Sequence, residues 1–372
     1  MTKTYDGLGN VLAVTDEANF TTSYGYDAAN QLTTVTDALN AVTQYGYDLS
    51  GNRTSQTDAN GHTTQYVFDA LNRRTSRTLP AVQIESFTYD AESNKISHTD
   101  FNGRTTALAY DTLNRLLSRT PAPFFNASPI TFTYTSTGKR ASMTDPTGTT
   151  TYTYTNRDQV SSKATPQGTL SYTYDLSGNV ASVVSSNANG TSVAYAWDAD
   201  SRLSSVTDNR TTGVTNYTYD QTSQLSSMQY PIGVTHAFTY DDRDWPINLN
   251  VTGPMGLSLN YAQTFSPSGR KTNVTEQTGR DTNYGYSSVY RLLSENITGD
   301  PTATNNGGLT YLLDPVGNRS SLTSTLTALP NQTFTYDADE SRSDSRLSCS
   351  TNLHRRPAAS DWYCRNRLAP WA

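Results

Sequence analysis

The sequence predicts an all-β protein built from antiparallel β-hairpin repeats of about 21 residues. Three observations predict it. An aromatic residue followed by Asp recurs at a regular interval, a second aromatic residue often stands two positions earlier, and Asp-x-x-Gly or Asp-x-x-Asn turns follow. Only 34% of the 372 residues are hydrophobic, whereas the 25 Tyr and abundant Thr favour strands. A thin β structure is therefore expected instead of several thick-cored domains.

The anchor of each repeat is the aromatic residue of a Tyr-Asp pair or a close variant of it. The first six anchors are 21 residues apart, and the later spacings range from 20 to 27. A fixed period of this length is typical of repeat proteins, whose units depend on their neighbours for stability. The sixteen anchors are Tyr5, Tyr26, Tyr47, Phe68, Tyr89, Tyr110, Tyr134, Tyr154, Tyr174, Trp197, Tyr219, Tyr240, Phe265, Tyr286, Leu313 and Tyr336.

The strand that precedes each anchor is predicted to carry its rings on one face. Tyr24 and Tyr26 illustrate the pattern, because a spacing of two places both rings on the same side of a strand. The residue between them, Gly25, is small, so the opposite face carries little bulk. Rings on successive strands are expected to form ladders, which contribute about 0.2–1 kcal/mol per cross-strand pair.

Two turns are predicted in each repeat. Asp follows the anchor, where it suits the first position of a type I turn, and Gly or Asn stands three places later, where left-handed backbone is needed. Asp48-Leu-Ser-Gly51 is such a turn, expected to be of the G1-bulge type. A second formula lies ten residues further on, so one repeat is two strands and two turns. It stands at Asp16-Glu-Ala-Asn19, Asp37-Ala-Leu-Asn40, Asp58-Ala-Asn-Gly61, Asp100-Phe-Asn-Gly103 and Asp145-Pro-Thr-Gly148.

The residues singled out as sites are structural, and no catalytic, cofactor-binding or metal-binding residue is predicted. The sequence has no G-x-S-x-G elbow, phosphate-binding Gly loop or H-E-x-x-H helix. The Asp58 turn lacks the further ligands of a calcium loop. The histidines His62, His98, His236 and His354 share no ligand spacing. The structural anchors are Tyr26, Asp27, Tyr47, Asp48, Gly51, Phe68, Asp69, Tyr89, Asp90, Tyr110, Asp111, Tyr174, Asp175, Gly178, Tyr219 and Asp220.

Charge and hydropathy exclude some classes of partner. With 33 Asp and Glu against 27 Lys and Arg, the chain lacks the positive charge of a broad nucleic-acid interface. No apolar run reaches the roughly 18–20 residues of a membrane helix, so no membrane span is expected. The first ten residues lack the hydrophobic stretch of a signal peptide.

The motif Y-D-x-x-G-N-R, followed by T-D-x-x-G-x-T-T, resembles the YD repeat, also called the Rhs repeat. It stands as YDLSGNRTSQTDANGHTTQYVFD at 47–69, with shorter copies at 110–120 and 174–184, and the resemblance covers about residues 4–338. It implies a sheet that spirals into a hollow shell, as in Rhs proteins, the C components of insecticidal toxin complexes and teneurins. This chain would be an open fragment of such a YD-repeat shell. The implied partner is an encapsulated C-terminal toxin segment that lies outside this chain.

Three functions stay open on the sequence. The favoured one is a structural, encapsulating module, without catalysis of its own, of an Rhs-type polymorphic toxin or a secreted cell-surface protein. The second is a module that binds carbohydrate or another cell-surface partner, because aromatic rows bind sugars. The third is a self-cleaving shell, since Asp314-Pro-Val-Gly317 and Asp145-Pro-Thr-Gly148 resemble the family's cleavage motif. Both occupy repeat turns and the family's core D-P-x-G-L stretch is missing, so plain turns are favoured.

The repeat pattern stops near residue 338. Residues 1–338 are predicted to form the β-strip, and 339–372 a non-repeat tail that contains Cys349 and Cys364. A segment this short, without strand or helix period, cannot bury a core unaided. It is interpreted as disordered or as the product of a shifted reading frame, and a remnant of a variable toxin segment is the alternative.

Overall fold

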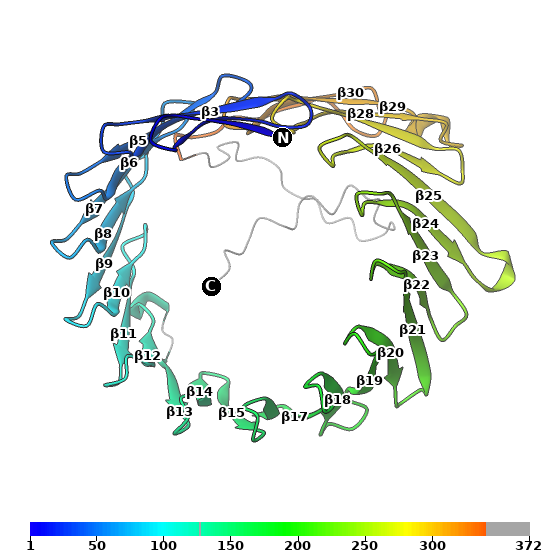
Figure 1. Cartoon of the computed structure of the whole chain (residues 1–372). Coiled ribbons are helices and arrows are strands. Elements are labelled where there is room, and N and C mark those ends of the chain that lie inside the picture. Colours follow the sequence, from blue (N-terminus) through cyan, green and yellow to red (C-terminus); the bar gives the residue numbers. More distant parts are fainter. Residues whose placement is uncertain (126–127, 340–372) are drawn as a thin grey trace.

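A computed structural model describes residues 1–125 and 128–339. One 31-stranded sheet contains all of its strands, and every pairing is antiparallel between strands adjacent in sequence. Figure 1 shows this strip curving through a full circle, so that its last strands return to its first. The all-β prediction of hairpin repeats in a spiralling sheet is confirmed. The predicted tail, with both cysteines, lies outside the described residues apart from Asp339.

The predicted anchors mark the ends of the odd-numbered strands. From Tyr5 to Leu313, each anchor is the last residue of its strand, and Tyr336 follows the short β31 (Gln332–Thr333). The odd strands are β1 (Thr2–Tyr5), β3 (Thr21–Tyr26), β5 (Val42–Tyr47), β7 (Thr63–Phe68), β9 (Ile84–Tyr89), β11 (Thr105–Tyr110), β13 (Ile130–Tyr134), β15 (Gly148–Tyr154), β17 (Gly168–Tyr174), β19 (Ser192–Trp197), β21 (Gly213–Tyr219), β23 (Thr235–Tyr240), β25 (Ser258–Phe265), β27 (Asp281–Tyr286) and β29 (Gly307–Leu313).

The even-numbered strands are the second strands of the hairpins, and each begins six residues after an anchor. They are β2 (Val11–Thr15), β4 (Leu32–Thr36), β6 (Arg53–Thr57), β8 (Arg74–Thr78), β10 (Lys95–Thr99), β12 (Leu116–Thr120), β14 (Arg140–Asp145), β16 (Val160–Thr165), β18 (Val180–Ser185), β20 (Leu203–Asp208), β22 (Leu225–Gln229), β24 (Pro246–Thr252), β26 (Lys271–Glu276), β28 (Leu292–Thr298) and β30 (Arg319–Ser324).

The three longest repeats keep their strands and lengthen a turn. The anchor spacings of 24, 25 and 27 residues each contain one short 3₁₀ helix between an even strand and the next odd strand. Surface loops tolerate such insertions because closing a slightly longer loop costs little entropy. The loosened period therefore leaves the strand order unchanged. The helices are η1 (Pro123–Phe125), η2 (Pro254–Gly256) and η3 (Ala303–Asn305).

From Tyr5 to Leu313, the turn after each anchor has the predicted bulge and a residue with positive φ. In the turn between β5 and β6, the Gly51 N–H donates to the Asp48 carbonyl at 3.1 Å and the Asp48 N–H to the Asn52 carbonyl at 3.0 Å. The Asp48 carboxylate accepts from the Asn52 N–H at 2.8 Å. Gly51 has φ +84°, and the register shifts beside Tyr47. Positive φ recurs at the equivalent Gly9, Asn30, Asn72, Asn114, Gly138, Gly178, Gly269 and Gly317.

One turn of the second formula differs from its prediction. In the other four, the fourth residue has φ between +62° and +83°, as at Asn19 and Gly61, whereas Gly148 has φ +123°. Asp145 instead pairs directly with Gly148, so only two residues connect β14 to β15. Both strands extend to the turn in unbroken register, and the hairpin closes without an additional turn residue. The shared formula therefore covers two turn geometries.

The anchor tyrosines join neighbouring hairpins through their hydroxyls. The sequence predicts ring-on-ring ladders, but the recurring contact is polar, because each ring reaches over the preceding strand and its hydroxyl meets a carbonyl there. The Tyr47 hydroxyl donates to the carbonyl of Leu32, the first residue of β4, at 2.9 Å. The same bond joins Tyr26 to Val11, Tyr89 to Arg74, Tyr110 to Lys95, Tyr134 to Leu116, Tyr154 to Arg140, Tyr174 to Val160, Tyr219 to Leu203, Tyr240 to Leu225, Tyr286 to Lys271 and Tyr336 to Arg319, and Trp197 reaches Val180 through its indole N–H.

These hydroxyl bonds lie where strand pairing has stopped. Between β4 and β5 the paired residues run only from Thr36 and Val42 to Thr34 and Gln44. Within the hairpin of β5 and β6, pairing continues up to the anchor. Each pair of hairpins is therefore joined by backbone bonds near one edge of the strip and by a phenol near the other.

The hydrophobic core is thin, as the composition predicts. Its one cluster of buried residues in the described part of the chain is Leu309, Tyr311 and Leu322, at 9%, 6% and 5% exposure. Leu292 and Leu313 pack against it. Stability must therefore come largely from the pairing of neighbouring hairpins.

Gly51→Val should lower the free energy of unfolding by about 1–2 kcal/mol, because a β-branched side chain is forced into positive φ. Its Cβ would also lie 3.2 Å from Gln31 Nε2. Ser50→Val, at the exposed neighbouring position, should have little effect. Thermal unfolding of both variants checks the turn geometry, and equal melting temperatures would contradict it.

Candidate functional site

The candidate site is the seam at which the end of the strip meets its beginning. We call the turns that join an odd strand to the next even strand the anchor rim; they run from 6–10 to 314–318. The turns that join an even strand to the next odd strand are the second rim, from 16–20 to 325–331. At the seam, the last turns of the anchor rim lie on the first turns of the second rim.

Several hydrogen bonds cross the seam, between residues 250 to 274 positions apart. One revolution of the strip therefore takes roughly twelve of the 21-residue repeats. The crossing bonds run from Ser288 Oγ to the Ala38 carbonyl at 3.4 Å, from Asn60 Nδ2 to Asp314 Oδ2 at 3.2 Å, from the Ala81 N–H to Asp339 Oδ1 at 2.9 Å, and from the Tyr290 hydroxyl to Asp16 Oδ2.

Tyr290 is an unusual residue for its turn. It has φ +62° at the position where other anchor turns carry Gly, Asn, Asp or Ser, and left-handed backbone is unfavourable for a bulky residue. Its ring lies edge-on to Phe20, with centroids 5.8 Å apart. The Tyr290 hydroxyl is the main cause of a lowered pKa at Asp16, while desolvation, followed by the Asp16 bond, raises the pKa of Tyr290. The contacts with Asp16 and Phe20 across the seam explain why a tyrosine occupies this left-handed position.

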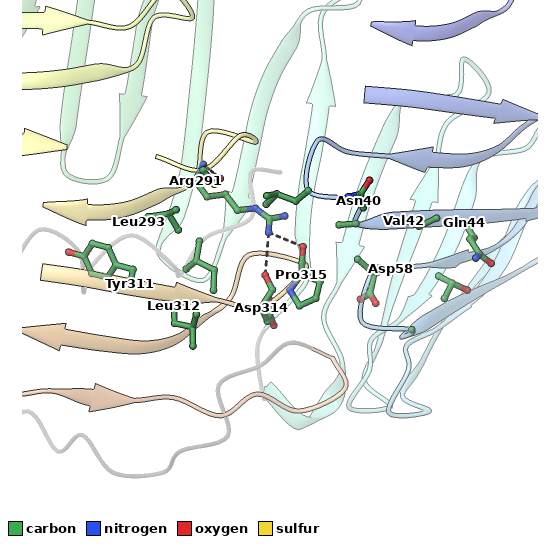
Figure 2. A pocket seen from close by; sticks show the side chains of 17 residues that line it. Asn40, Val42, Gln44, Asp58, Arg291, Leu293, Tyr311, Leu312, Asp314 and Pro315 are labelled. Carbon is green, nitrogen blue, oxygen red and sulfur yellow. Dashed lines mark hydrogen bonds between the residues drawn. The ribbon is translucent and has the colours of Figure 1, made fainter. Parts of the chain in front are cut away.

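We call one revolution of the strip a coil. A pocket opens at the seam between the first coil and the last repeats of the strip, which begin the next coil (Figure 2). Leu39, Val42 and Ala59 line it from the first coil, and Leu293 and Pro315 from the last. The walls are thus mainly apolar, and the side chains come from turns and strand ends far apart in sequence. This arrangement suits packing of one coil on another.

The charged groups of the pocket form hydrogen bonds with the backbone of turns. The Arg291 guanidinium donates to the Pro315 carbonyl at 2.8 Å and the Asp314 carbonyl at 3.3 Å, as Figure 2 shows. The Asp58 carboxylate accepts from the Asn60 and His62 N–H groups, both at 2.9 Å. These bonds fix the two turn tips that meet at the seam.

Asp314, the candidate for self-cleavage, caps its own turn. Its carboxylate accepts from the Gly317 and Asn318 N–H groups, both at 2.8 Å, from Asn318 Nδ2 at 3.0 Å and from Asn60 across the seam. Desolvation raises the pKa of Asp314, but these hydrogen bonds outweigh it and lower the pKa overall. The carboxylate is thereby held as an ionised acceptor.

The predicted structural anchors lie around the whole strip and are not gathered at the seam. Six of the tyrosines, at 26, 47, 89, 110, 174 and 219, donate the hydroxyl bonds described above, and Phe68 ends β7. Gly178, like Gly51, has positive φ. The turn-capping aspartates are Asp27, Asp48, Asp69, Asp90, Asp111, Asp175 and Asp220.

Sequence reasoning missed the residues of the seam. Asp16, Phe20 and Asn60 are ordinary repeat residues until their partners, more than 250 positions away, are known. Only Tyr290 carries a signal, as a bulky residue at a left-handed position, and that signal does not name its partner.

The described histidines contact nearby aromatic or acidic side chains. His98 stacks on Phe87 with ring centroids 4.9 Å apart, and its Nε2 lies 3.2 Å from the buried Glu85. His62 Nδ1 lies 3.7 Å from Asp58. Over residues 1–125 and 128–339, His, Cys, Asp and Glu form no group of three or more suited to a metal ion. The same residues contain no helix with the length and apolar character to span a membrane.

Acid should destabilise the fold. Hydrogen bonds from the Asn52 side chain, then from turn amides, lower the pKa of Asp48 below its ordinary 3.8. The contribution of such carboxylates is complete above their unfolded pKa and is lost as pH falls through the folded one. Calorimetry should show a nearly constant melting temperature down to about pH 5 and a fall below about pH 4; equal values at pH 3 and 7 would contradict the capping role. Lowered pKa values also occur at Asp6, Asp69, Asp111, Asp175, Asp198 and Asp220.

Tyr290→Asn should loosen the seam while leaving its own turn intact. Asn enters left-handed backbone more readily than Tyr, but it is too short to reproduce the contacts with Asp16 and Phe20. Energy transfer between dyes on cysteines introduced at the exposed Glu17 and Thr278 should fall.

The dye measurement uses a chain whose Cys349 and Cys364 are replaced by serine, so that labelling is confined to the introduced sites. Ser223→Asn is the matched control, because Ser223 holds the same left-handed position, φ +68°, in a turn away from the seam. Similar transfer in the two variants would show that Tyr290 does not hold the seam.

Comparison with known proteins gives four matches to one family, described as RHS Repeat, at residues 5–42, 26–63, 47–81 and 174–212. No curated protein matches the chain. Among solved structures, the fold is similar to that of TcdB2-TccC3, with TM-score 0.60, 15% identity and 90% of this chain covered. TcdB2-TccC3-TEV matches with TM-score 0.58 and 13% identity over 91%, and a Photorhabdus luminescens Tc holotoxin pore with 0.53 and 12% over 91%.

This chain spans only 21% to 24% of the length of those solved chains. At such identities the likeness concerns the fold. The four family matches identify the sequence repeat as well. They contain the same Tyr-Asp anchors and Asp-x-x-Gly turns that end and connect the strands. Residues 5–81 and 174–212 match the RHS Repeat family, and the strip as a whole has a fold similar to part of the Tc toxin structures.

Proposed function

We propose that this chain is a wall segment of an encapsulating RHS-repeat shell, without catalysis of its own. The full protein would be an Rhs-type polymorphic toxin or a secreted cell-surface protein. Its partner would be a C-terminal toxin segment that lies outside this chain. Secretion or display at the cell surface would be its location.

The observation that carries the proposal is the seam. A sheet that serves only as a flat scaffold has no reason to bring turns 250 positions apart into contact. Here the hydrogen bonds of Tyr290 and Asp314 fasten one coil to another, and the pocket at the seam is walled by side chains from both. Rim-to-rim contact of successive coils is what a continuous wall requires.

Encapsulation is tested with a passenger. A polypeptide that does not fold by itself is attached to the C-terminus of this chain and, separately, to a globular carrier. Digestion of the passenger by a nonspecific protease should be several-fold slower on this chain, because the surrounding wall limits access. The Tyr290→Asn chain should restore part of the cleavage rate, and equal rates on wall and carrier would overturn the proposal.

The non-catalytic part of the proposal has its own test. The Asp314 carboxylate is occupied by four hydrogen bonds, which supports a structural role. Purified chain is expected to keep its intact mass during long incubation. Fragments that end at Asp314 and disappear in Asp314→Asn would establish self-cleavage instead.

A further inference from the structure

The seam shows how one rim receives the other. The tip of the anchor turn at Asp314 and Pro315 shares a pocket with Leu39 and Ala59, which belong to two successive turns of the second rim. We call the two central residues of an anchor turn its tip, and the space between two successive turns of the second rim a notch. At the seam, a tip therefore lies in a notch. At the docked tips Val289 and Val316 are half-buried.

The rest of the anchor rim carries larger apolar tips that are not covered. Five leucines stand at the second or third position of these turns, and Leu49 is fully exposed. Exposed apolar side chains repeated along one edge are typical of an interaction surface. Their exposures are Leu8 75%, Leu49 109%, Leu71 64%, Leu113 69% and Leu176 91%.

An apolar notch of the kind found at the seam lies on the uncovered part of the second rim. Ile232 and Val234 line it from the turn after β22, and Pro254, Met255 and Leu257 from the turn after β24. Ile232 is 73% exposed and Met255 104%. Two successive turns thus again form the walls, with no described anchor tip between them.

We propose that a second copy of this chain occupies this notch, so that copies stack rim to rim. The contact continues the interface that the chain already makes with itself at the seam. Among the described residues, the anchor turns that reach the second rim contact it between residues 16 and 81, and none of these contacts lies at this notch. The leucine tips of one copy supply the missing partner.

The interface is heterologous, since a tip surface on one copy meets a notch surface on the other. After docking, one copy still has a free notch surface and the other a free tip surface, so the association is open-ended and grows with concentration. The proposal concerns this chain alone and stands apart from encapsulation. An isolated wall segment could stack whether or not it ever encloses a toxin.

Sedimentation velocity over a concentration series tests the stacking. The unmodified chain should form dimers and larger species as its concentration rises. The tip variant Leu49→Asn/Leu176→Asn should sediment as a monomer, since polar residues suited to turns replace the exposed leucines. The control Val67→Thr/Val184→Thr removes two exposed apolar side chains from strands, at 55% and 41% exposure, and should associate like the parent.

Mixing distinguishes tip-into-notch docking from other association. The notch variant Ile232→Ser/Met255→Asn should also be monomeric, and Asn suits the left-handed backbone of Met255, φ +56°. An equimolar mixture of tip and notch variants should form a one-to-one dimer, because each retains the surface that the other lacks. A monomeric parent at all concentrations, or a mixture that stays monomeric, would overturn the proposal.

Discussion

Gly299→Ala is expected to destabilise the protein by about 2–4 kcal/mol, from the combined cost of left-handed backbone and an overpacked contact. Gly299 has φ +69°, and a Cβ there would overlap the carbonyl oxygen of Gly279 in the preceding second-rim turn. The obstacle is backbone, which cannot rotate away as a side chain does. One turn would have to separate from the other.

Gly256→Ala is the matched control. Gly256 also has positive φ, +76°, but a Cβ at that position would meet nothing within 4 Å. Only the conformational cost of about 1–2 kcal/mol should then appear. Urea unfolding followed by circular dichroism compares the two variants, and equal loss of stability would show that the turns do not approach each other as described.

Leu322→Ala should cost about 2–4 kcal/mol, the usual effect of deleting a buried leucine side chain. Leu322 is 5% exposed and belongs to the buried cluster with Leu309 and Tyr311. The chain has little other core to compensate for a cavity at this place. The strands around the seam should therefore lose stability first.

Leu312→Ala provides the comparison, because Leu312 lies between Tyr311 and Leu313 on the opposite face of β29 and is 64% exposed. Its replacement should change stability by less than about 0.5 kcal/mol. Repeat proteins open locally, so hydrogen exchange of the β29 and β30 amides is the suitable measurement. Faster exchange in both variants alike would argue against the cluster.

The sequence predicts those parts of the fold that depend on neighbouring residues. Tyr47 ends β5 and Gly51 takes left-handed backbone because strand alternation and turn chemistry act within a few positions. The prediction of a ring ladder is wrong in detail, since the Tyr47 hydroxyl donates a hydrogen bond to a carbonyl of the preceding strand. Alternation says which face a ring occupies but not what its edge touches.

The seam could not be predicted in the same way. The contact between Tyr290 and Asp16 depends on the curvature of every hairpin between them, summed over about 270 residues. A small change in the angle per hairpin would move Tyr290 to another partner. Neither residue type nor spacing specifies that angle, so the candidate site emerges only from the assembled coil.

The phenol that bridges each pair of hairpins has a consequence for the diameter of the curved strip. Backbone bonds close one border of the strip, whereas at the other border a ring spans the gap, as Tyr47 does to Leu32. Neighbouring hairpins therefore diverge toward the bridged border, and the length of the bridging side chain sets their separation there. The side chain at the anchor position would then set the circumference of the curved strip. A longer or shorter side chain at that position would give a larger or smaller circumference.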